Sequence, residues 1–384
     1  MTKKLVSCIL VVCMLLSMLP TMAWAEEASP TDIEQTPAPV AEENASPTDL
    51  GKLDIADGSI VITATGYKQG SATNETPYTG DYVITQTGTD PLANYIHIEG
   101  GTHNITLNNV NLNGAIDDSD NKKDKGPFFV EGNANVTLTL IGTNNLKTTV
   151  KSAALEVVSG STVTIKVPDG QDNSYGKLVA ENTTDTECAG IGGSRWRATG
   201  TVIIESGTVI ANSHTGGYVS GIGPGRCQDM TKIEIAGGVV TVSGKYAMGY
   251  ENHNKKKVDT LEISGGTVTC SKGISADSYS ITGGNIITTE TLPAEDSNGR
   301  KLAKVYVVDA NGVAQKNEPV SVTVNSNTWK TYTDSDGIIT TYLAESDTIA
   351  GAQKLPDGWL IGGTCVCDTA DLSFADIKIY FNTL

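Results

Sequence analysis

A repeated phrase in the second half of the chain constrains the fold more than any other feature of the sequence. Each copy alternates apolar and polar residues, passes through a glycine or a pair of glycines, and ends on an apolar residue; the copies are Val202–Val209, Ile233–Val240, Leu261–Val268 and Tyr279–Ile286. A second phrase keeps step with it, and its apolar anchors Ile191, Ile222, Met248 and Ile274 are 31, 26 and 26 residues apart. Such a period is typical of solenoids, in which each repeat packs only on its neighbours.

We expect strands rather than helices to form the repeats. From residue 53 to 290, short β-branched runs alternate with turns of Gly, Asn, Asp and Ser, and no long run keeps a helical period. The residues expected to point inward, and to stack on the next coil about 4.8 Å away, are Val202, Ile204, Ile233, Ile235, Leu261, Ile263, Tyr279 and Ile281. The paired glycines are expected at corners, where a Cβ atom would clash. The pattern predicts an all-β parallel β-solenoid over residues 53–290; a β-sandwich, the alternative, would not require a phrase to return in step.

The two ends of the chain differ from the repeats. Lys3 and Lys4, the apolar run Leu5–Leu19 and the small-residue site Ala23–Ala25 predict a signal peptide over residues 1–25. Residues 26–52 are acidic, contain several prolines and have low hydrophobicity, which predicts a disordered linker.

A different pattern follows the repeats. Runs with a period of two, joined by turns rich in Asp, Asn and Gly, predict a small Ig-like β-sandwich over residues 302–384; the runs are Val305–Val308, Val320–Val324, Thr328–Tyr332, Ile338–Leu343 and Ile377–Phe381. This part of the sequence resembles the Ig-like repeats appended to secreted Gram-positive surface proteins.

Charge and cysteine content narrow the classes of partner. The chain of 384 residues carries 27 basic and 44 acidic side chains, so its net charge is -17. Such a charge repels phosphate backbones and anionic membrane surfaces, so we expect no nucleic-acid partner. We also expect no membrane insertion once the signal peptide is removed. The cysteines after it, Cys188, Cys227, Cys270, Cys365 and Cys367, are odd in number and irregularly spaced, which does not predict a disulfide framework.

The phrases Cys188–Gly193, Ser220–Gly225 and Glu262–Val268 resemble those of a family of secreted bacterial right-handed parallel β-helix proteins. In that family "AGIGG" and "I-x-GG-x-V" return in each coil, and an opening like Gly58–Thr63 followed by Tyr78–Ile84 is also typical. The resemblance covers most of residues 53–290. It implies a right-handed parallel β-helix of the pectate-lyase-like kind, and some members are described as carbohydrate-binding domains. Its motifs are structural rather than catalytic, so it bears on function by analogy.

Aromatic, arginine and histidine residues suited to binding a ligand occur just after the glycine-rich phrases. Since equivalent positions of successive repeats stack, these residues are expected to share one edge of the solenoid. Aromatic rings can pack on sugar C–H groups, while Arg and His donate hydrogen bonds to hydroxyls or carboxylates. The predicted ligand-binding residues are Arg195, Trp196, Arg197, Tyr218, Arg226, Tyr250 and His253.

A polysaccharide lyase is the alternative on the same scaffold. It would need carboxylates to hold Ca²⁺ and an arginine as base. Glu251 and Asp277 follow the anchors Met248 and Ile274 at the same distance and are the candidate Ca²⁺ ligands, while Arg226 and Glu251 are the candidate catalytic pair. Glu234 and Glu262 are also expected to stack on an outward face, where two carboxylates repel unless a cation lies between them.

The leading hypothesis from the sequence is a secreted or cell-surface carbohydrate-binding protein without catalysis and without a required cofactor. Its partner would be a polysaccharide or a cell-surface glycan, bound along the edge near Trp196, and it would be extracellular or associated with the cell envelope. A structural stalk or adhesin without glycan binding is the third alternative. It fits the linker and the C-terminal region equally well.

Overall fold

The chain was analysed as a computed structural model that describes residues 51–114, 116, 124–148, 150–182, 187–251, 256–309, 313–345, 347–354, 360–366 and 376–380. The predicted signal peptide and nearly all of the predicted linker lie outside the described residues and stay predictions. The regular secondary structure of the described residues consists of β-strands and one short 3-10 turn, η1 (Ile55–Asp57). Among them no helix is long and apolar enough to cross a membrane.

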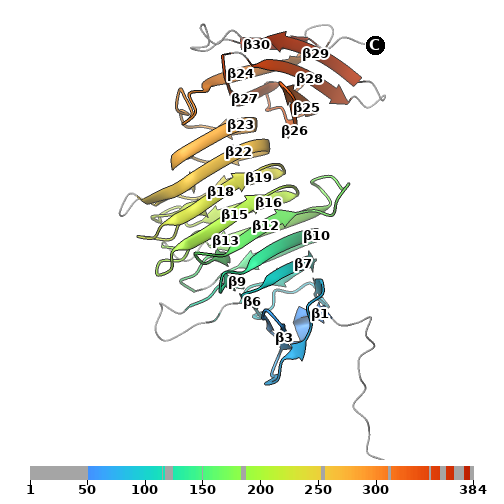
Figure 1. The fold of residues 1–384 in the computed structure, drawn as a ribbon, viewed down its shortest axis with the longest axis vertical. Coiled ribbons are helices and arrows are strands. Elements are labelled where there is room, and N and C mark those ends of the chain that lie inside the picture. Colours follow the sequence, from blue (N-terminus) through green and yellow to red (C-terminus); the bar gives the residue numbers. More distant parts are fainter. Residues whose placement is uncertain are drawn as a thin grey trace, which may run out of the picture. The chain divides into compact units, whose positions relative to one another are not determined.

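The largest sheet contains 14 strands (Figure 1). Its members are β1 (Lys52–Asp54), β5 (Tyr82–Thr85), β7 (Thr102–Asn108), β8 (Asn111–Leu112), β10 (Asn135–Lys147), β12 (Thr162–Lys166), β13 (Gly176–Asn182), β15 (Thr199–Ile204), β16 (Thr208–Ser213), β18 (Met230–Ile235), β19 (Val239–Ser243), β21 (Tyr250–Glu251), β22 (Lys256–Cys270) and β23 (Ala276–Thr288). All of their pairings are parallel except that of β21 with β22.

The register of this sheet follows the sequence repeat. Val202 pairs with Ile233, Ile233 with Leu261, and Leu261 with Tyr279, so each copy of the phrase lies beside the next. The expected inward residues are fully buried, apart from Tyr279, which is partly buried against the same core. The stacking of the repeats in parallel, residue on equivalent residue, is therefore confirmed.

The structure corrects the predicted fold class, a right-handed parallel β-helix, because the strands pair in a different order. A right-handed parallel β-helix is expected to keep its sheets separate, whereas eight parallel strands here form a closed circuit, in the order β10, β12, β15, β18, β22, β19, β16, β13 and back to β10. The closure is made at two long strands. β10 pairs with β12 through Asn135–Thr139 and with β13 through Gly142–Lys147, and β22 likewise pairs with β18 and then with β19.

The physical reason for this closure lies at the glycines. The sequence predicts corners at the paired glycines of the repeats, but strand pairing resumes directly after the pair Gly265–Gly266, and it also continues through the single Gly142. Gly142 and Gly266 have φ values of 62° and 77°, which only glycine adopts without strain. The chain therefore changes direction with at most a short irregularity, and one strand belongs to two runs of the sheet.

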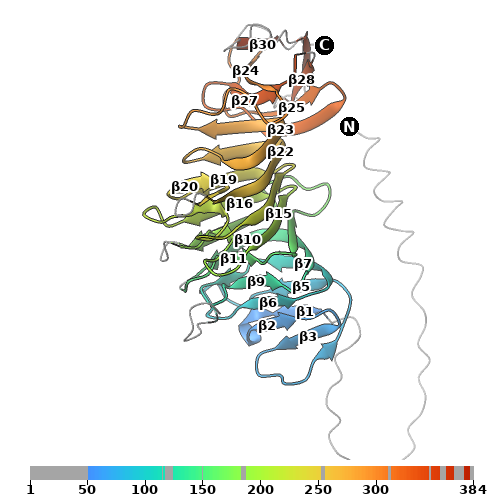
Figure 2. The same ribbon diagram turned by 60° about the vertical axis from the view of Figure 1, so that its left-hand side comes forward.

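A second sheet of nine strands runs in the order β20 (Tyr246–Met248), β17 (Ser220–Gly223), β14 (Ile191–Gly192), β11 (Leu155–Val157), β9 (Phe128–Glu131), β6 (Ile96–Glu99), β2 (Ile60–Ile62), β3 (Gly66–Gln69) and β4 (Thr76–Pro77). The pairings from β20 to β2 are parallel, and Figure 2 shows β6, β9 and β11 as successive neighbours. The anchors Ile191 and Ile222 pair in register within it, and Met248 pairs with both Ile222 and Ile274. Apolar residues from both sheets meet in one continuous core.

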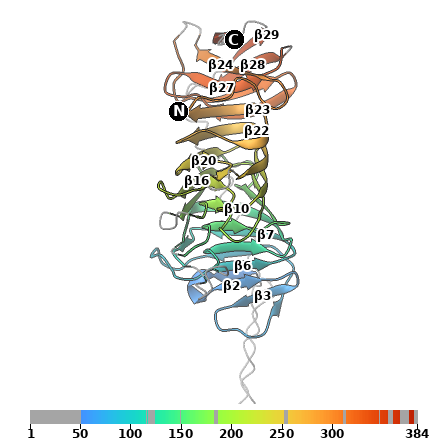
Figure 3. The same cartoon turned by 90° about the vertical axis from the view of Figure 1, so that its left-hand side faces the viewer.

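The C-terminal strands form two further sheets, and the predicted Ig-like sandwich is also corrected. One sheet has the order β27 (Ile338–Leu343), β24 (Lys301–Val308), β30 (Asp376–Tyr380), with β30 parallel to β24. The other has the order β26 (Asn327–Tyr332), β25 (Pro319–Val324), β28 (Thr348–Lys354), β29 (Leu360–Val366). Among these strands β26 and β27 contact β23, and Figure 3 shows β27 beside it. The C-terminal strands do not form an independent Ig-like unit, because the fully buried Tyr342 of β27 belongs to the core of the repeats.

Candidate functional site

The loops that follow β14 and β17 lie against each other. Ile191 pairs with Ile222, so the two loops start from equivalent positions of neighbouring repeats. Gly225 is in contact with the backbone of Ser194, because a Cβ atom on Gly225 would overlap the Ser194 carbonyl group. Neighbouring strands thus place two recognition loops side by side, at a separation that glycine permits.

A buried carboxylate joins these two loops. Glu187 accepts a hydrogen bond from Arg195 Nη1 at 2.6 Å and is also ion-paired with Arg226. Burial alone would raise the pKa of Glu187, but the hydrogen bonds from Arg226 and Arg195 outweigh it and hold that pKa below its ordinary value. Glu187 is therefore a fixed anion that positions both guanidinium groups.

Each of these guanidinium groups stacks on an aromatic ring. The guanidinium carbon of Arg195 lies 4.2 Å from the centre of the Trp196 ring, and that of Arg226 lies 4.7 Å from the centre of the Tyr218 ring. These are cation–π distances. Trp196 is 40% exposed and Tyr218 is 37% exposed, in a chain whose other large apolar side chains are mostly buried. We name the set Arg195, Trp196, Tyr218, Arg226 and Glu187 the aromatic–arginine cluster.

The aromatic–arginine cluster unites four of the seven predicted ligand-binding residues. Arg197 is not part of it, and His253 lies outside the described residues. Tyr250 is described by its backbone only, where it pairs with Lys257. Glu187, which holds the cluster together, was missed by the sequence reasoning; its position directly before the glycine-rich phrase at Cys188 is the signal that could have indicated it.

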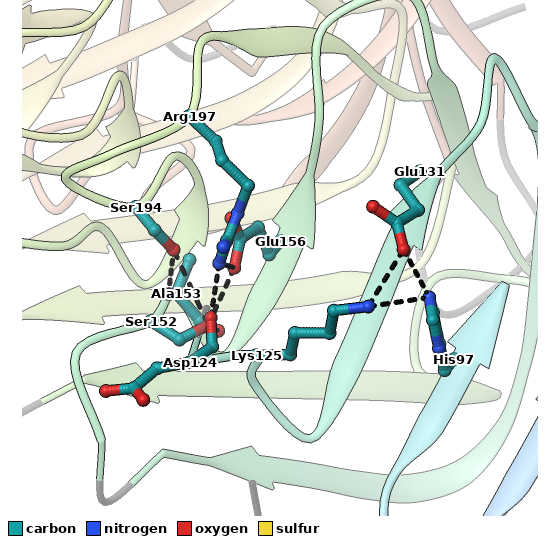
Figure 4. Close-up of polar contacts among 9 residues, drawn as sticks. All are labelled: His97, Asp124, Lys125, Glu131, Ser152, Ala153, Glu156, Ser194 and Arg197. Atoms are coloured by element: carbon teal, nitrogen blue, oxygen red, sulfur yellow. Dashed lines mark hydrogen bonds and ion pairs between the residues drawn. The ribbon is translucent and has the colours of Figure 1, made fainter. Parts of the chain in front are cut away.

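Arg197 points instead into a buried network, which Figure 4 shows. Its Nε donates to Glu156 Oε1 at 2.7 Å and its Nη2 to Glu156 Oε2 at 3.0 Å, a bidentate ion pair. Nη2 also donates to the backbone carbonyl of Asp124, and the guanidinium lies 5.0 Å from the centre of the Phe129 ring. Glu156 is 1% exposed, so this ion pair is almost completely removed from solvent.

The same network continues to His97 and Glu131. His97, Phe129 and Glu156 pair in register across β6, β9 and β11 and are all buried. Glu131 lies 2.8 Å from both His97 Nε2 and Lys125 Nζ (Figure 4). Lys125 also covers the Phe129 ring at 4.6 Å. The hydrogen bond with His97 is the largest of the effects that lower the pKa of Glu131 to about 2; burial opposes it and Lys125 adds to it.

This network ties chain segments to the second sheet. Lys125 and Arg197 come from segments outside the strands and neutralise carboxylates on β9 and β11. Ser152 also donates to Glu156 at 2.7 Å, and the backbone of Ala153 donates to Ser194 Oγ at 2.9 Å. The cations and carboxylates of this network are paired with one another, so we assign it a role in stabilising the fold rather than in a reaction.

The predicted Ca²⁺ ligands are not brought into register. Glu251 pairs with Lys256 within a local antiparallel turn, whereas Asp277 follows Ala276, which pairs with Val258. In the part of the chain that the structure describes, no group of three or more His, Cys, Asp or Glu side chains is close enough to hold a metal ion.

The predicted stack of Glu234 on Glu262 is confirmed by the register of β18 and β22. Lys232 supplies the cation between the two carboxylates, at 2.9 Å from Glu234 and 2.8 Å from Glu262.

No family model, no curated protein and no solved structure matches this chain. Its function is therefore argued from the geometry described above.

Proposed function

We propose that this chain is a non-catalytic carbohydrate-binding protein of the cell surface or the extracellular space, with a polysaccharide or cell-surface glycan as its partner. The observation that carries the proposal is the aromatic–arginine cluster. Two exposed rings from neighbouring repeats are each stacked by a guanidinium that a shared, buried carboxylate holds in place.

This geometry suits a sugar ligand. A sugar presents C–H groups on its ring faces and hydroxyl groups at its edge, so it needs a flat apolar surface beside hydrogen-bond donors. The Trp196 and Tyr218 rings supply the surface. Arg195 donates to Glu187, and a guanidinium carries five N–H donors in all, so the arginines suit a ligand rich in hydroxyl groups. Because Glu187 already orders both arginines, their side chains would lose little additional conformational entropy when a ligand binds.

The charges favour binding over lyase chemistry. Burial alone would lower the pKa of Arg226, but its hydrogen bond to Glu187 outweighs burial and raises that pKa above its ordinary value. A general base must give up its proton, so this pairing makes Arg226 a poorer base than an unpaired arginine. No observation in the described residues favours the lyase specifically.

The location outside the cytoplasm rests on the sequence. The apolar run after Lys3 and Lys4, the cleavage site at Ala23–Ala25 and the acidic, proline-containing segment that follows support export. The resemblance to secreted carbohydrate-binding proteins supports the same conclusion. An inert stalk does not require an ordered pair of exposed aromatic residues, so the aromatic–arginine cluster supports the binding proposal over the stalk.

The test is a pull-down of the full mature chain on insoluble polysaccharides and a glycan array, with Trp196→Ala and Tyr218→Ala as variants. We expect each variant to bind about tenfold more weakly, which corresponds to the loss of one stacked aromatic contact. Tyr175→Ala is the matched control, because Tyr175 is 42% exposed but is not part of the cluster.

The same supernatants are read for the ultraviolet absorbance of unsaturated uronates, with and without Ca²⁺. A rise in absorbance would contradict the non-catalytic proposal and favour the lyase. Unchanged binding in both cluster variants would remove the cluster as the binding site.

A further inference from the structure

A groove of about 1260 Å³ lies between the repeats and the C-terminal strands. One side is formed by the loop Gln171–Ser174 and by the turns that follow the inward residues of the repeats. The other side is formed by β25 and β26, from Pro319 to Tyr332. The groove shares no residue with the aromatic–arginine cluster.

The groove has a floor of bare backbone. Gly237 and Gly238 line it, and the carbonyl group of Glu205 lies so close to Gly237 that a Cβ atom there would overlap it. Further along the same row of turns, the Trp329 side chain rests on Gly265 and Gly283. Gly237 and Gly238 therefore leave a surface on which a flat ligand can lie close to the backbone, whereas Gly265 and Gly283 are covered by Trp329.

The wall formed by β26 is held rigidly against the repeats. Thr331 Oγ1 donates to the Gly266 carbonyl at 2.9 Å, and the Tyr332 amide donates to Thr267 Oγ1 at 2.8 Å. Asn285 donates to the Tyr332 carbonyl at 2.9 Å. Thr267, Thr331 and Asn285 are buried, so these bonds are shielded from water and keep the groove open at a fixed width.

One wall residue carries an unmet hydrogen-bond donor. Trp329 is 6% exposed, and its Nε1 atom has no hydrogen-bond partner among the described residues. A buried indole N–H without an acceptor is costly, and most buried donors in folded proteins are satisfied. The indole packs against Gly283 and belongs to the apolar core of the C-terminal strands, so Trp329 anchors this wall and does not itself present a donor to a ligand.

The lining identifies the class of ligand. It consists mostly of hydroxyl and amide side chains, with the 39% exposed Tyr332 as its accessible aromatic surface. Its carboxylates, Asp172 and Glu205, outnumber its one cation, Lys330, which disfavours an anionic ligand. Hydroxyls, amides and aromatic rings without an excess of positive charge suit a neutral polyol.

We propose that this groove binds a neutral oligosaccharide, as a second glycan site separate from the aromatic–arginine cluster. The inference rests on the proposed carbohydrate-binding function and specifies its ligand. The groove exceeds the size usual for small-molecule pockets, so an extended chain of several sugar units would occupy it.

The test is isothermal titration of the full mature chain with cellohexaose, mannohexaose and xylohexaose, and with an oligogalacturonate as the charged counterpart. The variants are Tyr332→Ala and Ser321→Trp, which remove an exposed aromatic side chain from the groove and fill it, respectively. The Tyr332 backbone bonds that hold β26 remain available in Tyr332→Ala. Tyr175→Ala is again the exposed-aromatic control, and thermal unfolding of each variant verifies its fold.

We expect one neutral hexasaccharide to bind the Trp196→Ala chain, and Tyr332→Ala to weaken that binding about tenfold. Ser321→Trp is expected to abolish it. Binding that Trp196→Ala removes and both groove variants leave unchanged would overturn the groove while leaving the aromatic–arginine cluster intact. Binding that only the groove variants remove would support the groove and contradict the cluster. Preference for the oligogalacturonate at the groove, or no binding of any sugar, would overturn this proposal.

Discussion

Arg195 and Arg197 are two residues apart and make the same kinds of contact, yet they belong to regions with different properties. Each guanidinium pairs with a glutamate and lies over an aromatic ring, Trp196 for Arg195 and Phe129 for Arg197. Trp196 is 40% exposed, whereas Phe129 is 1% exposed. The comparison indicates that burial determines the role of an arginine that pairs with a glutamate and stacks on an aromatic ring. Buried, it fastens chain segments to a sheet; exposed, it orders a surface that a ligand can reach.

The largest expected effect comes from breaking the buried pair. Glu156→Gln removes the charge that Arg197 faces and should lower the free energy of unfolding by about 3–5 kcal/mol, because a buried cation is left without compensation. Urea denaturation followed by circular dichroism measures the loss. Replacing both partners, as in Glu156→Leu with Arg197→Met, should recover much of it. A Glu156→Gln chain as stable as the parent would contradict the structural role of the network.

Acid should weaken the same network through Glu131. The pKa of Glu131 is about 2 in the folded chain against an ordinary value of 4.5. A lowered folded-state pKa stabilises the fold fully above the unfolded value, and that contribution disappears as pH falls from about 4.5 to about 2. The stability difference between the parent and Glu131→Gln should therefore be largest above pH 5 and vanish near pH 2. Denaturation curves across this range measure it, and a difference independent of pH would show that the ion pairs of Glu131 are not its cause.

Glu187→Gln tests the exposed side of the comparison. It removes the anion shared by Arg195 and Arg226, but the Glu187 side chain is 11% exposed against 1% for Glu156, so the free energy of unfolding should fall by only about 1–2 kcal/mol. Glycan binding should weaken as well, because the guanidinium groups would no longer fix the two rings. Denaturation and the polysaccharide pull-down measure the two effects, with Asp169→Asn as a control at an exposed carboxylate. A stability loss as large as that of Glu156→Gln would remove the distinction between the two regions.

The smallest effect is expected at the Lys232 ladder, which is an ion-pair set on an outward face. Lys232→Ala leaves Glu234 and Glu262 paired in register without their cation. The expected loss is below about 1 kcal/mol, because surface charges are well solvated and screened. Thermal unfolding at low and high salt measures it, and the loss should shrink at high salt. A salt-independent loss would indicate a packing role for the lysine stem.

Some of the site could be predicted from the sequence because it follows from the repeat. Trp196 and Arg226 follow the equivalent glycine-rich phrases Cys188–Gly193 and Ser220–Gly225, so their loops were expected to lie together. The structure places both residues in the aromatic–arginine cluster. The opposite direction of Arg197 could not be predicted, since it depends on Glu156, which lies 41 residues away on the second sheet. Apart from Glu156, the runs Ala153–Val158 and Phe128–Val130 are apolar on both faces, a pattern typical of strands covered on both sides. It does not say which cation covers Glu156.

In the C-terminal region, too, some strands could be predicted from the sequence and others could not. The period-two runs predicted β24, β25, β26, β27 and β30, whereas β28 and β29 were missed because their small, glycine-containing sequences carry little alternation. The docking of β26 onto the repeats could not be predicted either. It depends on Thr331 meeting Thr267 at 2.9 Å, and nothing in the local pattern of either strand specifies that contact.

The sequence by itself determined the strand content, the period of the repeats and the register in which Val202, Ile233, Leu261 and Tyr279 stack. Alternation and identical spacing are local properties, and strands with one apolar face have few registers that bury it. Only the tertiary structure decided that β10 and β22 continue through their glycines and close the main sheet, and that a buried Glu187 unites two loops. These outcomes depend on which backbones approach closely and which charges lose water, and both are set by residues far apart in the chain.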